Sequence, residues 1–127
     1  MANVSESMAT LLTIDGAKAV AVVDSKSGMV LGKEGSGVNL DVAAAGNTEV
    51  VRAKQKTMKA LGIKGNIEDI LITLDDQYHV IRPIADKDGI FIYLVLDKAK
   101  SNLAMARYKV QEVEQMLMFW SVRTEQC

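Results

Sequence analysis

The apolar run of residues 90–96 constrains the fold of this chain more than any other feature. It reads Ile-Phe-Ile-Tyr-Leu-Val-Leu, so an extended strand here is apolar on both faces. Strands of this kind occur in sheets that are covered on both sides. The amphipathic segment Asn102–Trp120 follows closely and can supply part of that cover. The run therefore predicts a β-sheet with helices on each face.

A second apolar run, Ala17–Val23, predicts the other central strand, because it also needs cover on both faces. The turn-forming residues 25–28, Ser-Lys-Ser-Gly, follow it and predict a hairpin with Met29–Lys33 as its second strand. On the other side of the central pair we expect strands Tyr78–Arg82 and Ile67–Leu74. Met29–Lys33 and Ile67–Leu74 then form the two edges of a five-stranded sheet.

The edge strand predicted at Ile67–Leu74 is apolar, with Ile70, Leu71 and Ile72 in its middle. An apolar edge is a liability unless another chain pairs with it. Pro83 has no backbone N–H to donate, so we expect pairing of the neighbouring strand to end at or before Arg82.

Three helices are predicted. The first begins after a capping residue, Asn3, and its apolar residues recur at helical spacing until Gly16. The second spans Leu40–Leu61, with Asn39 or Asp41 as its cap and Gly62 after its end. Gly46 leaves a later start at Asn47 as an alternative, and we expect the longer helix.

The last helix has two rows of apolar residues. One row predicts the core-facing side: Leu103, Ala106, Val110, Val113, Leu117 and Trp120. The second row lies beside it: Met105, Tyr108, Met116 and Phe119. We expect this second row to form extra core against the first helix, with partner binding as the alternative.

Composition narrows the class of protein. The 127 residues predict a single domain over 1–127, with a core over about 3–120 and a tail over 118–127, and 49% hydrophobic content is ample for a core. A net charge of -1 and the lack of a basic stripe argue against nucleic acid as a partner. The amino end does not resemble a signal peptide, and no apolar run is long enough for a membrane span, so we expect a cytoplasmic protein without membrane insertion.

Candidate catalytic, metal and cofactor sites are few, and we expect no enzyme activity and no cofactor. His79 is the only histidine and has no Ser, Cys or carboxylate beside it in the sequence. Cys127 is the only cysteine, so an internal disulfide is excluded. The segment Gly32–Gly37 lacks the Gly-Lys-Ser/Thr ending of a phosphate loop. Four acidic residues fit no calcium loop and are better explained as turn residues: Asp75, Asp76, Asp86 and Asp88. Four cations on the second helix predict a solvated face, with an acidic partner as the alternative: Arg52, Lys54, Lys56 and Lys59.

Two stretches of the chain carry a resemblance to a known family. Gly16, Val22–Asp24 and Gly28–Leu31 are similar to the opening hairpin of the roadblock/dynein light chain (Roadblock/LC7) domain, and Leu94–Arg107 is similar to its final strand and helix. The resemblance extends from about Leu11 to Leu117, and it is to bacterial members in particular. It implies an α+β, roadblock/profilin-like fold, in the order α-β-β-α-β-β-β-α, with a five-stranded antiparallel sheet and helices on both faces.

The resemblance also implies a homodimer in which the edge strand Ile67–Leu74 pairs with its symmetry mate and the long helix packs on its counterpart. The candidate interface residues are Val50, Val51, Lys54, Met58, Ile70 and Ile72, and we expect some of them to serve the core of the single chain instead. Bacterial members of the family resemble regulators or scaffolds of small Ras-like GTPases, and eukaryotic members include dynein light chains. The tail Met118–Cys127 has no role that the resemblance implies.

Three functions fit this fold. The first is a non-catalytic homodimer that binds a Ras-like GTPase and either favours one nucleotide state or accelerates hydrolysis by ordering the GTPase's own groups. The second is a structural adaptor of the dynein light chain type with no effect on GTP turnover. The third is a small-ligand sensor, which requires a cavity. Partner capture separates the first two, and a ligand screen tests the third.

Overall fold

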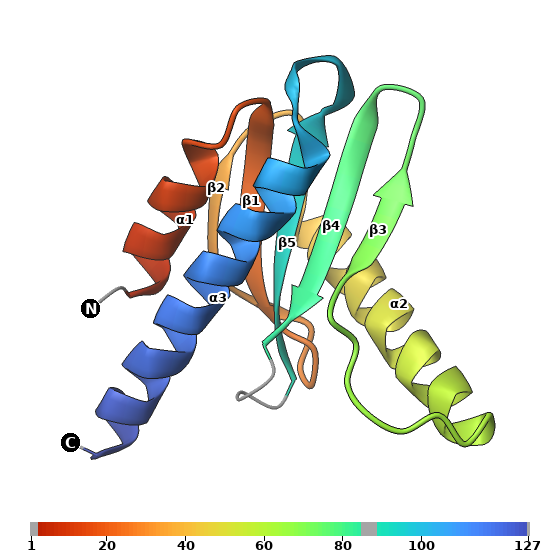
Figure 1. Cartoon of the computed structure of the whole chain (residues 1–127). Helices are drawn as coiled ribbons and strands as arrows, with labels where there is room; N and C mark the ends of the chain where they lie inside the picture. The colour runs from red at the N-terminus through yellow and green to blue at the C-terminus, as the bar shows by residue number, and fades with distance from the viewer. Residues whose placement is uncertain (1–2, 85–88, 127) are drawn as a thin grey trace.

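The structure is a computed structural model that describes residues 3–84 and 89–126, and the side chains up to residue 117 (Figure 1). The elements follow one another along the chain as α1 (Val4–Leu12), β1 (Ala17–Asp24), β2 (Met29–Gly35), α2 (Leu40–Ala60), β3 (Ile70–Thr73), β4 (Gln77–Pro83), β5 (Ile90–Asp97), η1 (Lys98–Lys100) and α3 (Leu103–Gln126). The predicted order of helices and strands is confirmed.

All five strands form one antiparallel sheet in the order β2-β1-β5-β4-β3. The two apolar runs are the central neighbours, with Val20 opposite Leu94 and Val22 opposite Ile92. Their burial on both faces is the reason they lie in the middle. The two edges are β2 and β3, as the pattern predicts.

Helices α1 and α3 lie together on one face of the sheet (Figure 1). Their apolar stripes pack against every second residue of the central strands to form one core cluster. Ala106, Val110, Val113 and Leu117 of α3 are buried, so the core-facing stripe of the last helix is confirmed in the part with described side chains. Trp120 lies outside that part.

Helix α2 lies on the opposite face (Figure 1). The second cluster, which contains Leu40, Ala44 and Val51 of α2, uses the other alternate residues of the strands, with Phe91 and Tyr93 as its largest buried side chains. The cover of this face is partial, because residues 52–57, 59 and 60 of α2 are exposed.

The helix ends follow from local sequence. Asn3 and Asn39 accept hydrogen bonds from the backbone N–H groups three residues later, at 2.7 and 3.2 Å. At the end of α2, Gly62 has a φ of 72°, and Ile63 donates its N–H to the Met58 carbonyl at 2.9 Å. This closing pattern needs a left-handed residue, which glycine adopts at little cost. The longer version of α2 is confirmed, with Gly46 inside it.

The prediction for Pro83 is wrong by one residue, because β4 continues to Pro83, which pairs opposite Phe91. The next residue, Ile84, donates its N–H to the Ile90 carbonyl at 2.8 Å. Donors alternate between the two sides of an antiparallel strand, so the donor that proline lacks would point away from β5. On that side β3 does not extend as far as Pro83, because its first residue, Ile70, lies opposite Ile81. No hydrogen bond of the sheet is therefore lost. β3 itself is also shorter than the predicted Ile67–Leu74.

The expectation of extra core in the second row of α3 is wrong for the three residues with described side chains. Met105, Tyr108 and Met116 are exposed, at 55%, 57% and 46%. The buried cluster that α1 joins contains the first-row residues of α3, and α1 is too short to bury the second row as well. Phe119 of this row lies beyond the described side chains, as does the tail Met118–Cys127.

Candidate functional site

The free edge of β3 is the first element of the candidate site. β3 pairs with β4 on one side, with Ile72 opposite His79, and within residues 3–84 and 89–126 no strand pairs with its other side. Ile70 and Ile72 are half-buried and pack against the α2-side cluster. The other edge, β2, carries a bulge where it meets Val22 and Val23, and bulges discourage edge pairing. β3 is therefore the better edge for a further strand.

The outer face of α2 is the second element. It presents small and apolar residues at helical spacing: Val42, Gly46, Val50, Ala53, Thr57 and Leu61. Val42, Val50 and Leu61 are exposed, and a Cβ added at Gly46 would meet no atom within 4 Å. An apolar stripe facing away from its own core is typical of a surface that another molecule covers.

The predicted interface residues fall in different places. Val50 and Lys54 are exposed on α2. Val51 is only 2% exposed and lies in the core of the single chain, so it offers no surface to a partner. Met58 is half-buried and lines a pocket, while Ile70 and Ile72 combine core packing with a place on the free edge. The expectation that some candidates serve the single chain holds for Val51.

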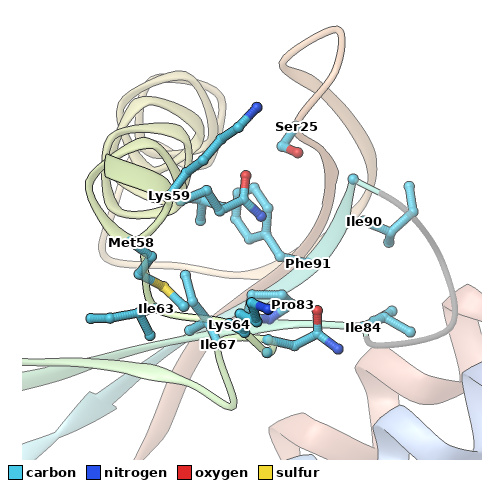
Figure 2. Close-up of a pocket in the computed structure, with 15 residues that line it drawn as sticks. Ser25, Met58, Lys59, Ile63, Lys64, Ile67, Pro83, Ile84, Ile90 and Phe91 are labelled. Carbon is cyan, nitrogen blue, oxygen red and sulfur yellow. The ribbon is translucent and has the colours of Figure 1, made fainter. Parts of the chain in front are cut away.

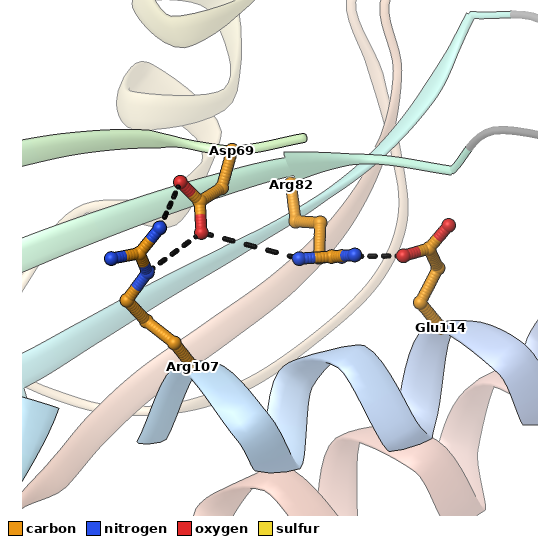
Figure 3. Close-up of polar contacts among 4 residues, drawn as sticks. All are labelled: Asp69, Arg82, Arg107 and Glu114. Atoms are coloured by element: carbon orange, nitrogen blue, oxygen red, sulfur yellow. Dashed lines mark hydrogen bonds and ion pairs between the residues drawn. The ribbon is translucent and has the colours of Figure 1, made fainter. Parts of the chain in front are cut away.

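A chain of ion pairs anchors the entry to β3 (Figure 3). Asp69, just before β3, accepts two hydrogen bonds from Arg107 of α3, at 2.8 and 2.9 Å. It also lies 4.0 Å from Arg82 of β4, which in turn donates to Glu114 of α3. The hydrogen bonds to Asp69 raise the pKa of Arg107. The cluster thus ties the edge strand to α3 through charged groups.

His79 and Tyr93 form a polar pair on the α2 side of the sheet. The Tyr93 hydroxyl lies 3.1 Å from His79 Nδ1, and His79 Nε2 lies 2.9 Å from Gln77 Oε1. Burial lowers the pKa of His79 and raises the pKa of Tyr93. His79 is thus a hydrogen-bonded strand residue, as its sequence position suggests.

A pocket of about 470 Å³ lies between the second half of α2, the loop from α2 to β3, and the ends of the inner strands (Figure 2). Apolar side chains from α2, the loop and the strands meet in it: Met58, Ile63, Ile67, Pro83, Ile84, Ile90 and Phe91. Lys59 and Ser25 lie at one side of it in Figure 2. Its volume is in the range of small-molecule sites.

Other kinds of site find little support in the described residues. Among them no helix is long and apolar enough to cross a membrane, and no three His, Cys, Asp or Glu residues gather as metal ligands do. Asp86, Asp88 and Cys127 lie outside the described residues. The cations of α2 are exposed, and Arg52 donates a 2.8 Å hydrogen bond to the Lys26 carbonyl and lies 3.3 Å from Glu49.

Comparison with known proteins supports the fold. No protein-family model and no curated protein matches the sequence. The structure is similar to a Roadblock/LC7 domain from Streptomyces avermitilis, with a TM-score of 0.82 and 12% identity over 95% of this chain and 99% of that one. The chain has the Roadblock/LC7 fold. It is also similar to Myxococcus xanthus MglB (TM-score 0.82, 14% identity, 96% and 99% covered) and to MglB with a tetrameric arrangement (TM-score 0.78, 18% identity, 90% and 84% covered).

The Roadblock/LC7 fold of this chain contains two features that the sequence patterns did not reveal. The pocket joins residues that are far apart along the chain, and only folding brings them together. The ion cluster had one visible signal, because Glu114 interrupts the buried face of α3 next to Val110, Val113 and Leu117. A carboxylate in that position needs a buried cation, and Arg82 is that partner.

Proposed function

We propose that this chain is a non-catalytic homodimeric regulator or scaffold of a small Ras-like GTPase. One observation carries the proposal: the edge of β3, to which no other described strand pairs, and an exposed apolar stripe on α2 occur in the same chain. The similarity of the fold to Roadblock/LC7 proteins, one of them an MglB in a tetrameric arrangement, supports self-association.

In the proposed dimer, β3 pairs with β3 of a second copy about a twofold axis. Each copy then supplies the hydrogen-bond groups that the other lacks, so the two sheets become continuous. The outer faces of the two α2 helices pack together, with Val50 and Leu61 among the residues that lose exposed surface. Gly46 has no side chain and Ala53 has only a methyl group, so the two helices can approach closely there.

A regulatory rather than catalytic role fits the chemistry of the described residues. His79 is hydrogen-bonded to Gln77 and Tyr93, and among the described residues no serine or cysteine forms a hydrogen bond with it. A dimer of this kind would act by holding the water and switch loops of the GTPase in place.

Two measurements test the proposal. Sedimentation at micromolar concentration is expected to show twice the mass of 13.8 kDa, and Ile72→Lys is expected to shift the population to single chains by placing a charge at a dry contact. Gln115→Lys, which introduces the same charge at an exposed position of α3 on the opposite face of the sheet, serves as the control. Single chains for the unaltered protein would contradict the dimer.

The GTPase part needs its own experiment. The chain is mixed with each Ras-like GTPase of the same cell, loaded with GDP or with a GTP analogue, and we expect affinity for one of them to depend on the nucleotide. If the chain binds neither the GDP form nor the GTP form of any of these GTPases, the GTPase part of the proposal is contradicted.

A structural adaptor is the second candidate. The exposed row of Met105, Tyr108 and Met116 on α3 favours it, because Met and aromatic side chains are common at protein–protein contacts. An adaptor would recover partners that are not GTPases and would leave GTP hydrolysis rates unchanged.

A further inference from the structure

The pocket beside α2 exists because the second half of the helix does not pack closely against the sheet. Val51, Gln55, Met58 and Lys59 share the side of α2 that faces the strands. Val51 is buried, whereas Gln55 and Lys59, one and two turns later, are exposed. In Figure 1 this half of α2 extends beyond the strands. A helix face that points inward and still meets solvent leaves space between the helix and the sheet.

The walls of that space are held in place from both ends. Arg52 of α2 bonds the Lys26 carbonyl in the turn between β1 and β2, at 2.8 Å. The closing hydrogen bond from Ile63 to Met58 fixes the start of the loop that forms another wall. Asp69, bonded to Arg107, fixes the end of the same loop. The pocket is therefore a formed feature of the fold.

The lining combines an apolar base with positive charge. Phe91 is buried beneath the space, and Ile63, Ile67 and Met58 complete the apolar part (Figure 2). The described lining residues include two lysines, Lys59 and Lys64, and no acidic side chain. Ser25, Gln55 and Asn66 add hydrogen-bonding groups.

We propose that this pocket binds a small organic anion with an apolar body, of which a medium-chain carboxylate is the simplest example. The apolar body lies against Phe91 and Ile67, and the anionic group meets Lys59. Most ligand sites pair an apolar lining with a few polar groups that fix orientation. The pocket volume of about 470 Å³ lies within the range of small-molecule sites, so it has room for a molecule of this size.

This site does not compete with the proposed dimer. The pocket uses the inner side of α2, while the stripe that contains Val42, Gly46 and Ala53 lies on the outer side. The inference is also independent of any GTPase, so binding of the anion can be tested in the isolated protein.

The test uses octanoate as the probe and octylamine, which has a similar chain and the opposite charge, as its counterpart. Titration followed by NMR is expected to move the signals of Phe91, Ile63 and Met58 with octanoate at millimolar concentration, and less with octylamine. Lys59→Glu is expected to weaken octanoate binding by about tenfold. Lys56→Glu, a charge reversal three residues earlier on α2 and outside the pocket, is the matched control and is expected to bind normally.

A second pair of variants tests the space itself. Gln55→Trp places a large ring in the pocket from an exposed helical position and is expected to abolish octanoate binding, whereas Lys56→Trp leaves it unchanged. The inference is overturned if octanoate moves no pocket signal, if octylamine binds equally well, or if the variants at positions 55 and 56 behave alike.

Discussion

On the face of the sheet under α1 and α3 the two helices bury one core cluster, whereas on the face under α2 a pocket remains between the helix and the sheet. The first face has a long helix whose stripe is buried from Ala106 to Leu117, and a short helix beside it. The second has a single helix that is buried mainly in its first half, as far as Val51. One sheet thus serves both needs of a small protein: the closed face stabilises the fold, and the open face offers surfaces for other molecules.

Polar groups are also divided between the faces. On the closed face the charges are paired across elements, from Arg82 of β4 to Glu114 of α3. On the open face His79 and Tyr93 form a partly buried pair, and the Asn47 side-chain nitrogen has no hydrogen-bond partner among the described residues. Changes to buried side chains such as Leu117 on the closed face should therefore alter stability, and changes to exposed side chains of α2 should alter binding.

The largest effect is expected from Glu114→Ala, which removes the partner of Arg82 on the closed face. The side chains of Arg82 and Glu114 are 15% and 6% exposed, so the variant leaves a buried cation with only the more distant Asp69. Breaking a buried pair costs about 3–5 kcal/mol of unfolding free energy. Urea unfolding measures it, and a cost below about 1 kcal/mol would show that the pair is as weak as one on the surface.

A pair of leucines compares the two faces directly. Leu117→Ala on α3 removes a buried side chain and is expected to cost about 2–5 kcal/mol. Leu61→Ala after α2, where the side chain is 66% exposed, is expected to change the stability of the single chain by no more than about 0.5 kcal/mol. Both are measured by denaturant unfolding at a concentration where the protein is a single chain. Equal costs would contradict the contrast between the faces.

His79 links the open face to pH. Burial lowers its pKa in the folded state, so the unfolded chain binds the proton more readily. The contribution of His79 to stability is present above the unfolded pKa of about 6.5 and is lost as pH falls through the lowered folded pKa. His79→Gln should flatten the decline of unfolding free energy between about pH 7 and pH 5. The same slope in both proteins would argue that His79 is freely solvated.

The smallest effect is expected from Met105→Lys on the outer row of α3. The Met105 side chain is exposed, so stability should change by no more than about 0.5 kcal/mol. Partner capture should weaken if this row is a contact of an adaptor. A clear loss of stability in thermal unfolding would instead place Met105 in the core.

Much of the fold was accessible from local patterns. The central pair β1 and β5 followed from two runs that are apolar on both faces, and the helix ends followed from Asn3, Asn39 and Gly62. The candidate site was accessible only in outline. The free edge at Ile70 and Ile72 was predicted, but the pattern did not separate Val50, which is exposed, from Val51, which is buried.

The sequence by itself determined which segments form strands and helices and which strands lie inside. A helix buried on one face shows apolar residues at regular spacing, and a strand buried on both faces shows a continuous apolar run, so neighbouring residues are enough to reveal each pattern. Tertiary structure decided the rest. The second row of α3 is exposed because no other helix packs over it in the described part of the chain. The hydrogen-bond partner of Asp69 is Arg107, which lies 38 residues away in the sequence. The pocket depended on the direction in which α2 leaves the sheet. These outcomes come from the packing of whole elements, whose distances and angles are not encoded in any short stretch of residues.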